Sequence, residues 1–235
     1  MIRSGRYVVI PDLVQVRVIA PASAAIPWWL AGGISAASCV AAYQAIGAAS
    51  LADSYVNLAN PGTYDAAPGV APSWAAASGW TFNGTTQYLT TSYTPTATNH
   101  TVAVRYSNYT RAATYPRLLG AAKTGNQDPR TLIASDTTQS AWANGGSVKF
   151  LATPLGTSGV AVVAAANAYL DGASIGTLTT SGTALTCGLY IGAQNNGGVV
   201  GNYGSSTIQA IAIYNATLTA DQVSALTTAM NALTG

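Results

Sequence analysis

Acidic residues are scarce in this sequence, and none of them is a glutamate. The seven acidic side chains are dispersed aspartates: Asp12, Asp53, Asp65, Asp128, Asp136, Asp171 and Asp221. Hydrolysis of a glycosidic bond needs two carboxyl groups that face each other across the bond. Because the sequence groups no two aspartates in such a motif, we expect no glycosidase activity and no catalytic residue.

Histidine and cysteine are nearly absent as well. The one histidine, His100, stands at the start of an expected strand, where we predict an exposed polar residue and no catalytic triad. Cys39 and Cys187 are expected to be buried thiols within strands, with a disulfide between them left open. Structural zinc takes four cysteine or histidine ligands, so we predict no such metal site.

Charge of either sign is low. Charged residues make up 7% of the chain and the net charge is +2, whereas an ordinary soluble domain carries about 25% charged residues. The nine cations do not cluster, which argues against a nucleic-acid partner, because binding nucleic acid requires grouped cations. A surface of Thr, Ser, Asn and Gln suits a protein packed against its neighbours or an exported binding module.

Long apolar runs are absent too. No window reaches the roughly 18 apolar residues of a membrane-spanning helix, so we predict no membrane partner. Residues 1–24 imitate a secretion signal, but Pro11, Asp12, Gln15 and Arg17 interrupt the apolar stretch. We therefore expect no cleaved signal.

Short β-branched and aromatic runs fill the chain, separated by Gly, Asn, Pro and Thr. This pattern predicts an all-β sandwich or barrel. Within residues 101–107, Val102, Val104 and Tyr106 fall on one face of a strand by the two-residue alternation. Alanine runs such as 161–166 let either a second sheet or another chain approach closely, and the sequence does not choose between them.

Two local signals mark a hairpin and a helix. Asp171-Gly172 supplies the positive-φ residues of a tight turn. Thr219 and Gln222 form a capping box that opens a short C-terminal helix. The apolar face of this helix holds Val223, Leu226, Met230 and Leu233.

Residues 1–35 differ from the remainder, and we expect them to form an extended arm ahead of a domain spanning 36–235. Their alternating pattern suits strand addition to the sheet edge of a neighbouring subunit, with aromatic anchors in its pockets. The candidate partner-binding residues are Tyr7, Val9, Val16, Val18, Pro27, Trp28, Trp29 and Leu30. The alternative, that the two tryptophans fold back onto the sandwich of their own chain, stays open.

Five stretches in a fixed order carry a family likeness: "VAAYQAIGAASLADSYVN", "WTFNGTTQYLTT", "HTVAVRY", "NAYLDGASIGTL" and "IQAIAIYNATLTADQVSAL". Together they resemble the laminin-G-like, concanavalin-A-like family, which implies an antiparallel jelly-roll β-sandwich with a short C-terminal helix. Gln209 and Ala210 stand where the family's closing strand carries acidic residues. This departure suggests a structural use of the scaffold, because the fold alone does not fix a function.

Two loops are candidates for ligands. The resemblance implies a weak calcium site near Asp53 and Asp65, and the alternative is a loop closed by Asx turns. We otherwise expect no cofactor. The loop 192–206 groups amides and an aromatic ring, so the candidate glycan-binding residues are Asn195, Asn196, Asn202 and Tyr203.

The resemblance and the low charge together suggest a non-enzymatic bacteriophage virion protein, located in the virion after assembly in the host cytoplasm. We expect a capsid decoration (cement) protein or a tail-associated component, anchored through residues 1–35. Its partners would be a major capsid or tail protein and further copies of itself in a homo-oligomer. The alternative is a carbohydrate-binding, lectin-like module or adhesin on a phage tail or bacterial surface.

Overall fold

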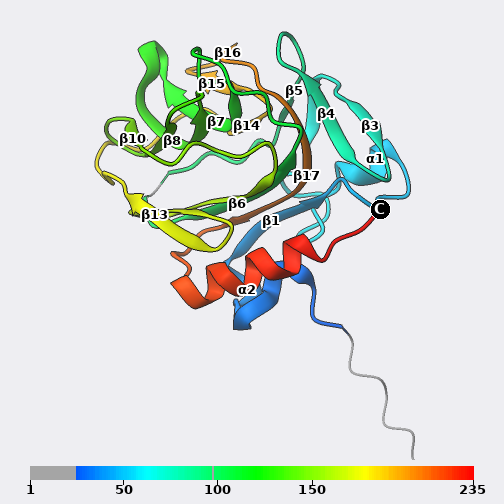
Figure 1. The fold of residues 1–235 in the computed structure, drawn as a ribbon. Helices are drawn as coiled ribbons and strands as arrows, with labels where there is room; N and C mark the ends of the chain where they lie inside the picture. Colours follow the sequence, from blue (N-terminus) through cyan, green and yellow to red (C-terminus); the bar gives the residue numbers. More distant parts are fainter. Residues whose placement is uncertain (1–24, 97) are drawn as a thin grey trace, which may run out of the picture.

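The computed structural model of the chain describes residues 25–96 and 98–235. In this part of the chain two β-sheets lie face to face, and a helical layer covers the outer face of one of them (Figure 1). The predicted β-sandwich with a short C-terminal helix is therefore confirmed. Four candidate partner-binding residues lie outside the described residues: Tyr7, Val9, Val16 and Val18.

Sheet A is antiparallel and is organised around one long strand, β17 (Ser205–Tyr214). One half of β17 pairs with β4 and the other half with β1, while β6 pairs along its opposite side. The spatial order is β13 (Ala173–Thr177), β12 (Asn167–Leu170), β11 (Gly159–Ala164), β6 (Thr101–Ser107), β17, β4 (Gly79–Asn83) and β3 (Ser73–Ala75), with β1 (Cys39–Gln44) also on β17.

Sheet B forms the second layer. Its order is β10 (Lys149–Leu151), β9 (Ser140–Asn144), β8 (Gln127–Ser135), β7 (Arg117–Lys123), β14 (Tyr190–Ile191), β5 (Tyr88–Thr90) and β2 (Ala67–Val70), with β15 (Gln194–Asn196) running parallel to β7 and pairing with β16 (Val199–Gly201). The remaining helical turns are α1 (Leu51–Ser54), η2 (Ala36–Ser38) and η3 (Thr124–Asn126).

The main core fills the space between the two sheets. Val102, Val104 and Tyr106 of β6 point into it together, as their alternation predicted. Trp80 from sheet A and Trp142 from sheet B are both fully buried there. Burial of large apolar side chains contributes about 1.5–3 kcal/mol each, so this layer provides most of the driving force for folding.

The outer face of sheet A is built from small side chains under a helix. Ala42, Ala103, Ala210 and Ala212 are fully buried there, beneath α2 (Ala220–Asn231). Figure 1 shows α2 lying across this face, on the side away from sheet B. Alanine at these positions lets the helix approach the strands closely.

Helix α2 begins and ends with specific polar contacts. The predicted capping box is confirmed: Thr219 Oγ1 accepts the Gln222 N–H at 3.2 Å, and Gln222 Oε1 accepts the Thr219 N–H at 3.0 Å. At the other end, a guanidinium nitrogen of Arg105 donates to the carbonyls of Met230 and Leu233, both at 2.8 Å. The Leu233 N–H also donates to the Met230 carbonyl, at 3.2 Å, and the cation adds a second donor where the helix ends.

The two tryptophans lie on their own sandwich. They open the 3-10 segment η1 (Trp28–Gly33), and Trp28, Trp29 and Leu30 pack beside α2 against the outer face of sheet A. The indole rings are perpendicular, with centroids 5.5 Å apart. Tyr214 Oη donates to the Trp29 carbonyl at 2.8 Å. Pro27 is exposed. The tryptophans thus fold back onto the sandwich of their own chain, as the alternative proposed. The ring surface that these contacts cover is surface that binding to a partner would have used.

Gly32 allows this close approach. Its φ is +71°, and a Cβ there would lie 2.8 Å from the Cβ of Ala225 in α2. The neighbouring Gly33 has the same φ, but a Cβ there would contact nothing within 4 Å. The first glycine is therefore needed for packing and backbone conformation, the second for backbone conformation alone.

The single histidine and the cysteines differ in part from expectation. His100 is buried at 2% exposure, and its Nε2 lies 2.6 Å from Thr131 Oγ1, so the prediction of an exposed residue was wrong. Cys39 is buried in β1, where burial raises the pKa of its thiol to about 12. Cys187 is half-buried in a loop rather than in a strand. Both cysteines are free thiols.

The predicted hairpin is confirmed between β12 and β13. Asp171 and Gly172 have φ values of +51° and +83°. Among the helices that the structure describes, none is both long and apolar enough to cross a bilayer.

Candidate functional site

Three tyrosines gather on the outer face of sheet B, and we call them the tyrosine patch: Tyr88, Tyr190 and Tyr203. Strand alternation places Tyr88 and Tyr190 on this outer face. Leu89 of β5 and Ile191 of β14 are buried in the core between the sheets, so the preceding residue in each strand faces the opposite way. Tyr203 joins them from the loop between β16 and β17.

The rings of the patch are in contact and partly exposed. The Tyr88 ring centroid lies 5.0 Å from that of Tyr190 and 6.3 Å from that of Tyr203. In the described part of the chain no hydrogen bond holds any of the three hydroxyls, which leaves them available to a ligand. Burial and the neighbouring phenol raise the pKa of Tyr190. The phenol of Tyr190 therefore stays neutral at physiological pH, where it acts as both donor and acceptor.

A glycine lies beneath the central ring of the patch. The Tyr88 ring lies over Gly69 of β2, so closely that a Cβ at position 69 would overlap the ring carbons at 2.1 Å. Position 69 therefore controls the orientation of the central ring of the patch.

The three candidate asparagines build the neighbouring loop. Asn195 is 3% exposed, and its amide bonds two backbone groups at 2.8 and 2.7 Å. Asn196 Oδ1 accepts the Asn126 N–H at 2.8 Å. Asn202 is exposed, and its amide donates to Gln194 Oε1 at 3.0 Å. Their hydrogen-bonding groups are thus largely committed to the fold.

A buried arginine, Arg117, forms hydrogen bonds that fix the loop carrying Tyr203. Arg117 is 6% exposed, and its Nε donates to Gln194 Oε1 at 3.0 Å. Burial lowers the pKa of this guanidinium to about 10. The Arg117 backbone N–H donates to the Asn202 carbonyl, and a Cβ on Gly204 would lie 2.0 Å from the Arg117 carbonyl oxygen. The backbone on both sides of Tyr203 is therefore held in place, which limits the positions open to its ring.

Sequence reasoning named Tyr203 as a candidate ligand residue but not Tyr88 or Tyr190. The signal was present in the alternation of "QYLTT" and "GLYIGAQ", where an apolar residue facing the core follows each tyrosine. What the sequence could not supply is the pairing of β5 with β14, which brings the two rings together.

The proposed calcium loop is closed by its own hydrogen bonds. Asp53 Oδ2 accepts the Ser50 hydroxyl at 2.6 Å, in the first turn of α1. Asp65 Oδ1 accepts the N–H groups of Asn57 and Gly62 at 2.8 and 3.2 Å. Within the described residues, no three acidic, histidine or cysteine side chains gather as a metal site would require. The Asx-turn alternative is seen at Asn57, whose Oδ1 accepts the N–H groups of Ala59 and Asn60 at 3.1 and 3.3 Å.

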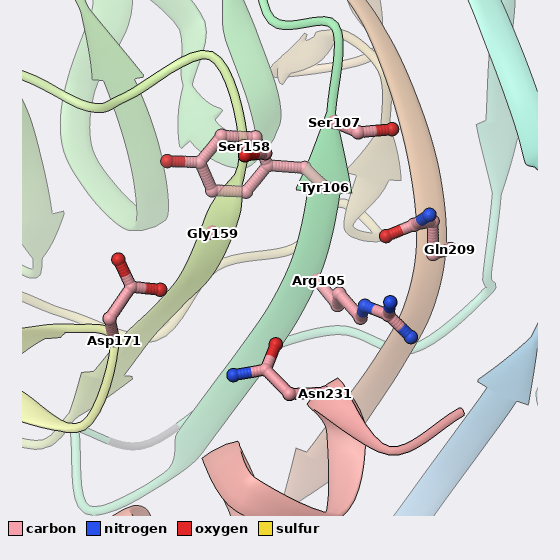
Figure 2. Close-up of a pocket in the computed structure, with 8 residues that line it drawn as sticks. All are labelled: Arg105, Tyr106, Ser107, Ser158, Gly159, Asp171, Gln209 and Asn231. Carbon is pink, nitrogen blue, oxygen red and sulfur yellow. The ribbon is translucent and has the colours of Figure 1, made fainter. Parts of the chain in front are cut away.

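A polar cleft of about 380 Å³ opens on the other side of the molecule, beside the C-terminal end of α2. It is lined by Arg105, Asp171, Gln209 and Asn231, among others, and Figure 2 shows these side chains arranged around it. The cleft lies at the outer face of sheet A and shares no residue with the tyrosine patch.

No protein-family model and no curated protein matches this sequence. Solved structures do. Trypanosoma rangeli sialidase, in complex with 2,3-difluorosialic acid, has a TM-score of 0.61 at 16% identity, over 91% of this chain and 36% of that one. The binding domain of Paraclostridial Mosquitocidal Protein 1 has a TM-score of 0.56 at 10% identity, over 80% of this chain and 51% of that one.

A weaker likeness, with a TM-score of 0.46 at 19% identity, links 61% of this chain to 78% of a heptameric SAP-like pentraxin from Limulus polyphemus. The chain spans only about a third of the sialidase length. The two matches with TM-scores above 0.5, to the sialidase and to the mosquitocidal protein, show a shared fold over the matched regions, and a fold by itself carries no activity.

Proposed function

We propose that this protein is a non-catalytic carbohydrate-binding β-sandwich of the concanavalin-A-like jelly-roll kind, and that it holds a glycan on the tyrosine patch. The observation that carries the proposal is the contact of three partly exposed rings around Tyr88, with hydroxyls that no described residue binds. Sugar rings present C–H faces to aromatic rings and hydroxyls to phenols, so one surface serves both contacts.

The surroundings favour an uncharged sugar. The patch itself contains only tyrosines, and the one salt bridge among the described residues joins Lys123 and Asp128. The nearby guanidinium of Arg117 is buried and bound to Gln194. A neutral hexose or oligosaccharide therefore fits the patch better than a sialylated or uronic-acid glycan.

A non-catalytic role is supported by how the aspartates are used. Asp53 and Asp65 accept hydrogen bonds within their loop, and Asp136 accepts those of a turn. Asp128 is paired with Lys123 at 2.7 Å. None of these carboxylates lies on the tyrosine patch, and Asp171 and Asp221 lie near α2, so among the described residues no acid–nucleophile pair faces a glycan held there.

A glycan array probed with the full-length protein tests the proposal, followed by calorimetry on the glycans retained. We expect Tyr88→Ala and Tyr203→Ala each to weaken binding about tenfold or more, since removal of a stacked ring costs roughly 1–3 kcal/mol by analogy with base stacking. Tyr64→Ala is the matched control, because that ring is 39% exposed and contacts Tyr93 instead.

Gly69→Ala gives a sharper test, because it displaces the Tyr88 ring without removing it. Gly201→Ala is its control, since a Cβ there meets nothing within 4 Å. Retention of no glycan by the array, or equal losses for Tyr64→Ala and Tyr88→Ala, would contradict the proposal.

A second proposed role is that of a virion decoration or tail component, bound to a capsid or tail protein and to its own copies. Its support is the 7% charge and the alternating pattern of residues 6–20. Because Trp28–Gly33 pack on the sandwich, the informative truncation removes residues 1–24 only. We expect the truncated protein to keep its melting temperature and lose particle association. Unchanged association would refute an anchoring arm.

A further inference from the structure

The polar cleft beside α2 holds two opposite charges. Arg105 comes from the outer face of sheet A, and Asp171 from the turn between β12 and β13. Figure 2 shows the Asp171 carboxylate on one side of the cleft and the guanidinium on the other, with the Asn231 amide between them. Gln209 reaches in from β17.

These charges are not paired with each other. In the described part of the chain the one ion pair is Lys123–Asp128, far from this cleft in the fold. One guanidinium nitrogen of Arg105 donates to the carbonyls of Met230 and Leu233, which leaves its other N–H groups without a protein acceptor among the described residues. Asp171 Oδ1 accepts the Val160 N–H at 2.8 Å, and Oδ2 has no such partner.

Both charges are held in place by the fold. Arg105 is tied to the end of α2, and partial burial lowers the pKa of its guanidinium. Asp171 sits at a positive φ of 51°, and its carboxylate packs over Gly159, where a Cβ would come within 2.8 Å of it. Groups that are already fixed lose little side-chain entropy when a ligand binds them.

We propose that this cleft binds a small zwitterion of amino-acid size, with its carboxylate on Arg105 and its ammonium on Asp171. A simple anion would be repelled by the carboxylate, and a simple cation by the guanidinium. A single carboxylate is too few for a divalent cation, which takes several oxygen ligands. The volume of about 380 Å³ admits a free amino acid.

Calorimetric titration of the full-length protein tests this site. The zwitterionic probes are L-alanine, β-alanine and 4-aminobutyrate, which differ in the spacing of their charges. The single-charge probes are N-acetyl-L-alanine, which keeps the carboxylate, and L-alanine methyl ester at pH 6, which keeps the ammonium. We expect at least one zwitterion to bind about tenfold more tightly than either single-charge probe.

Two variants separate the charges. Asp171→Asn keeps an acceptor for the Val160 N–H but removes the charge, and we expect it to abolish the preference for the zwitterion over N-acetyl-L-alanine. Asn231→Asp adds a carboxylate beside Arg105 and should weaken every probe that carries a carboxylate. Asp221→Asn, in the first turn of α2, is the matched charge control and should leave binding unchanged.

Thermal melts of the variants distinguish a lost site from a lost fold. The proposal is overturned if no zwitterion binds, or if a single-charge probe binds as tightly as the best zwitterion. It is also overturned if D-glucose displaces the zwitterion at the same concentration as a second zwitterion does, or if Asp171→Asn keeps the same preference for the zwitterion as the unmodified protein. The site does not depend on glycan binding. Tyr203→Ala, which removes a ring of the tyrosine patch, should leave the zwitterion affinity unchanged.

Discussion

The two outer faces of the sandwich use opposite side-chain sizes. On sheet A the outward residues include Ala42, Ala103 and Ala212, and a helix lies directly on them. On the β5–β14 side of sheet B the outward residues include Tyr88 and Tyr190, which stay partly exposed. A face of small residues is closed by the chain's own helix, whereas a face of large aromatics remains available to a ligand.

Loss of the covering helix should be the most damaging change to sheet A. Leu226 of α2 is fully buried over the alanines. We expect Leu226→Ala to reduce the free energy of unfolding by about 2–5 kcal/mol, measured in urea. The exposed Ser224→Ala on the same helix should change it by less than about 0.5 kcal/mol. Equal effects would mean that α2 contributes little to sheet A.

The junction between η1 and α2 should be the next most sensitive. Gly33→Ala places a side chain at positive φ and should cost about 1–2 kcal/mol. Gly32→Ala carries the same backbone cost plus the clash with Ala225, about 1–3 kcal/mol more. The additional loss should shrink in the Gly32→Ala, Ala225→Gly double variant. Identical losses at the two glycines would show that η1 is not held tightly on the helix.

A smaller, pH-dependent effect is expected beside sheet B. Asp136 accepts the N–H groups of Thr138 and Gln139 and the Tyr115 hydroxyl, which lower the pKa of its carboxyl from 3.8 to about 2. A lowered folded-state pKa contributes stability that is present above pH 4 and is lost as the pH falls toward 2. Asp136→Asn should therefore be less stable at pH 7, with the difference closing by pH 2. Urea unfolding across this range measures it, and a gap independent of pH would contradict the assignment.

The smallest effect is kinetic. Cys39 is 4% exposed in the cluster that η1 and α2 cover, and the raised pKa of its thiol disfavours the reactive thiolate. In a disulfide-exchange assay at pH 8 we expect Cys187 to react first and Cys39 to wait for local opening. Gly32→Ala should accelerate Cys39 and leave Cys187 unchanged. Acceleration of both would indicate general loosening of the sandwich.

Strand alternation, helix capping and turn residues predicted the elements that depend on neighbouring residues in the sequence. Strand β6 follows from its alternation, the start of α2 from Thr219 and Gln222, and the hairpin turn from Asp171. The short strands β2, β3, β15 and β16 carry no comparable signal in the sequence, because three or four residues show too little periodicity. Strands β2 and β15 also pair with partners distant in sequence, β5 and β7, and these pairings supply stability that the short segments lack.

The candidate site was predicted less completely for the same reason. Tyr203 was selected from its loop, whereas its contact with Tyr88 depends on sheet pairing across more than a hundred residues. His100 was predicted to be exposed because it is a polar residue at the start of a strand. The structure buries it, since Thr131 of the facing sheet lies against its ring. The sequence predicted that Trp28 and Trp29 bind a neighbouring subunit. Alternation and aromaticity cannot distinguish a partner's surface from the surface of the same chain, on which the structure places both rings.

The perpendicular tryptophan pair also equips the protein with an optical signal. Two indoles held 5.5 Å apart at a fixed angle couple their electronic transitions. The circular dichroism of the coupled indole bands reports the relative orientation of the rings. Release of η1 from the helix would erase this signal while the backbone spectrum of the sheets persisted. Opening of one edge of the molecule can thus be followed separately from global unfolding, without an added label.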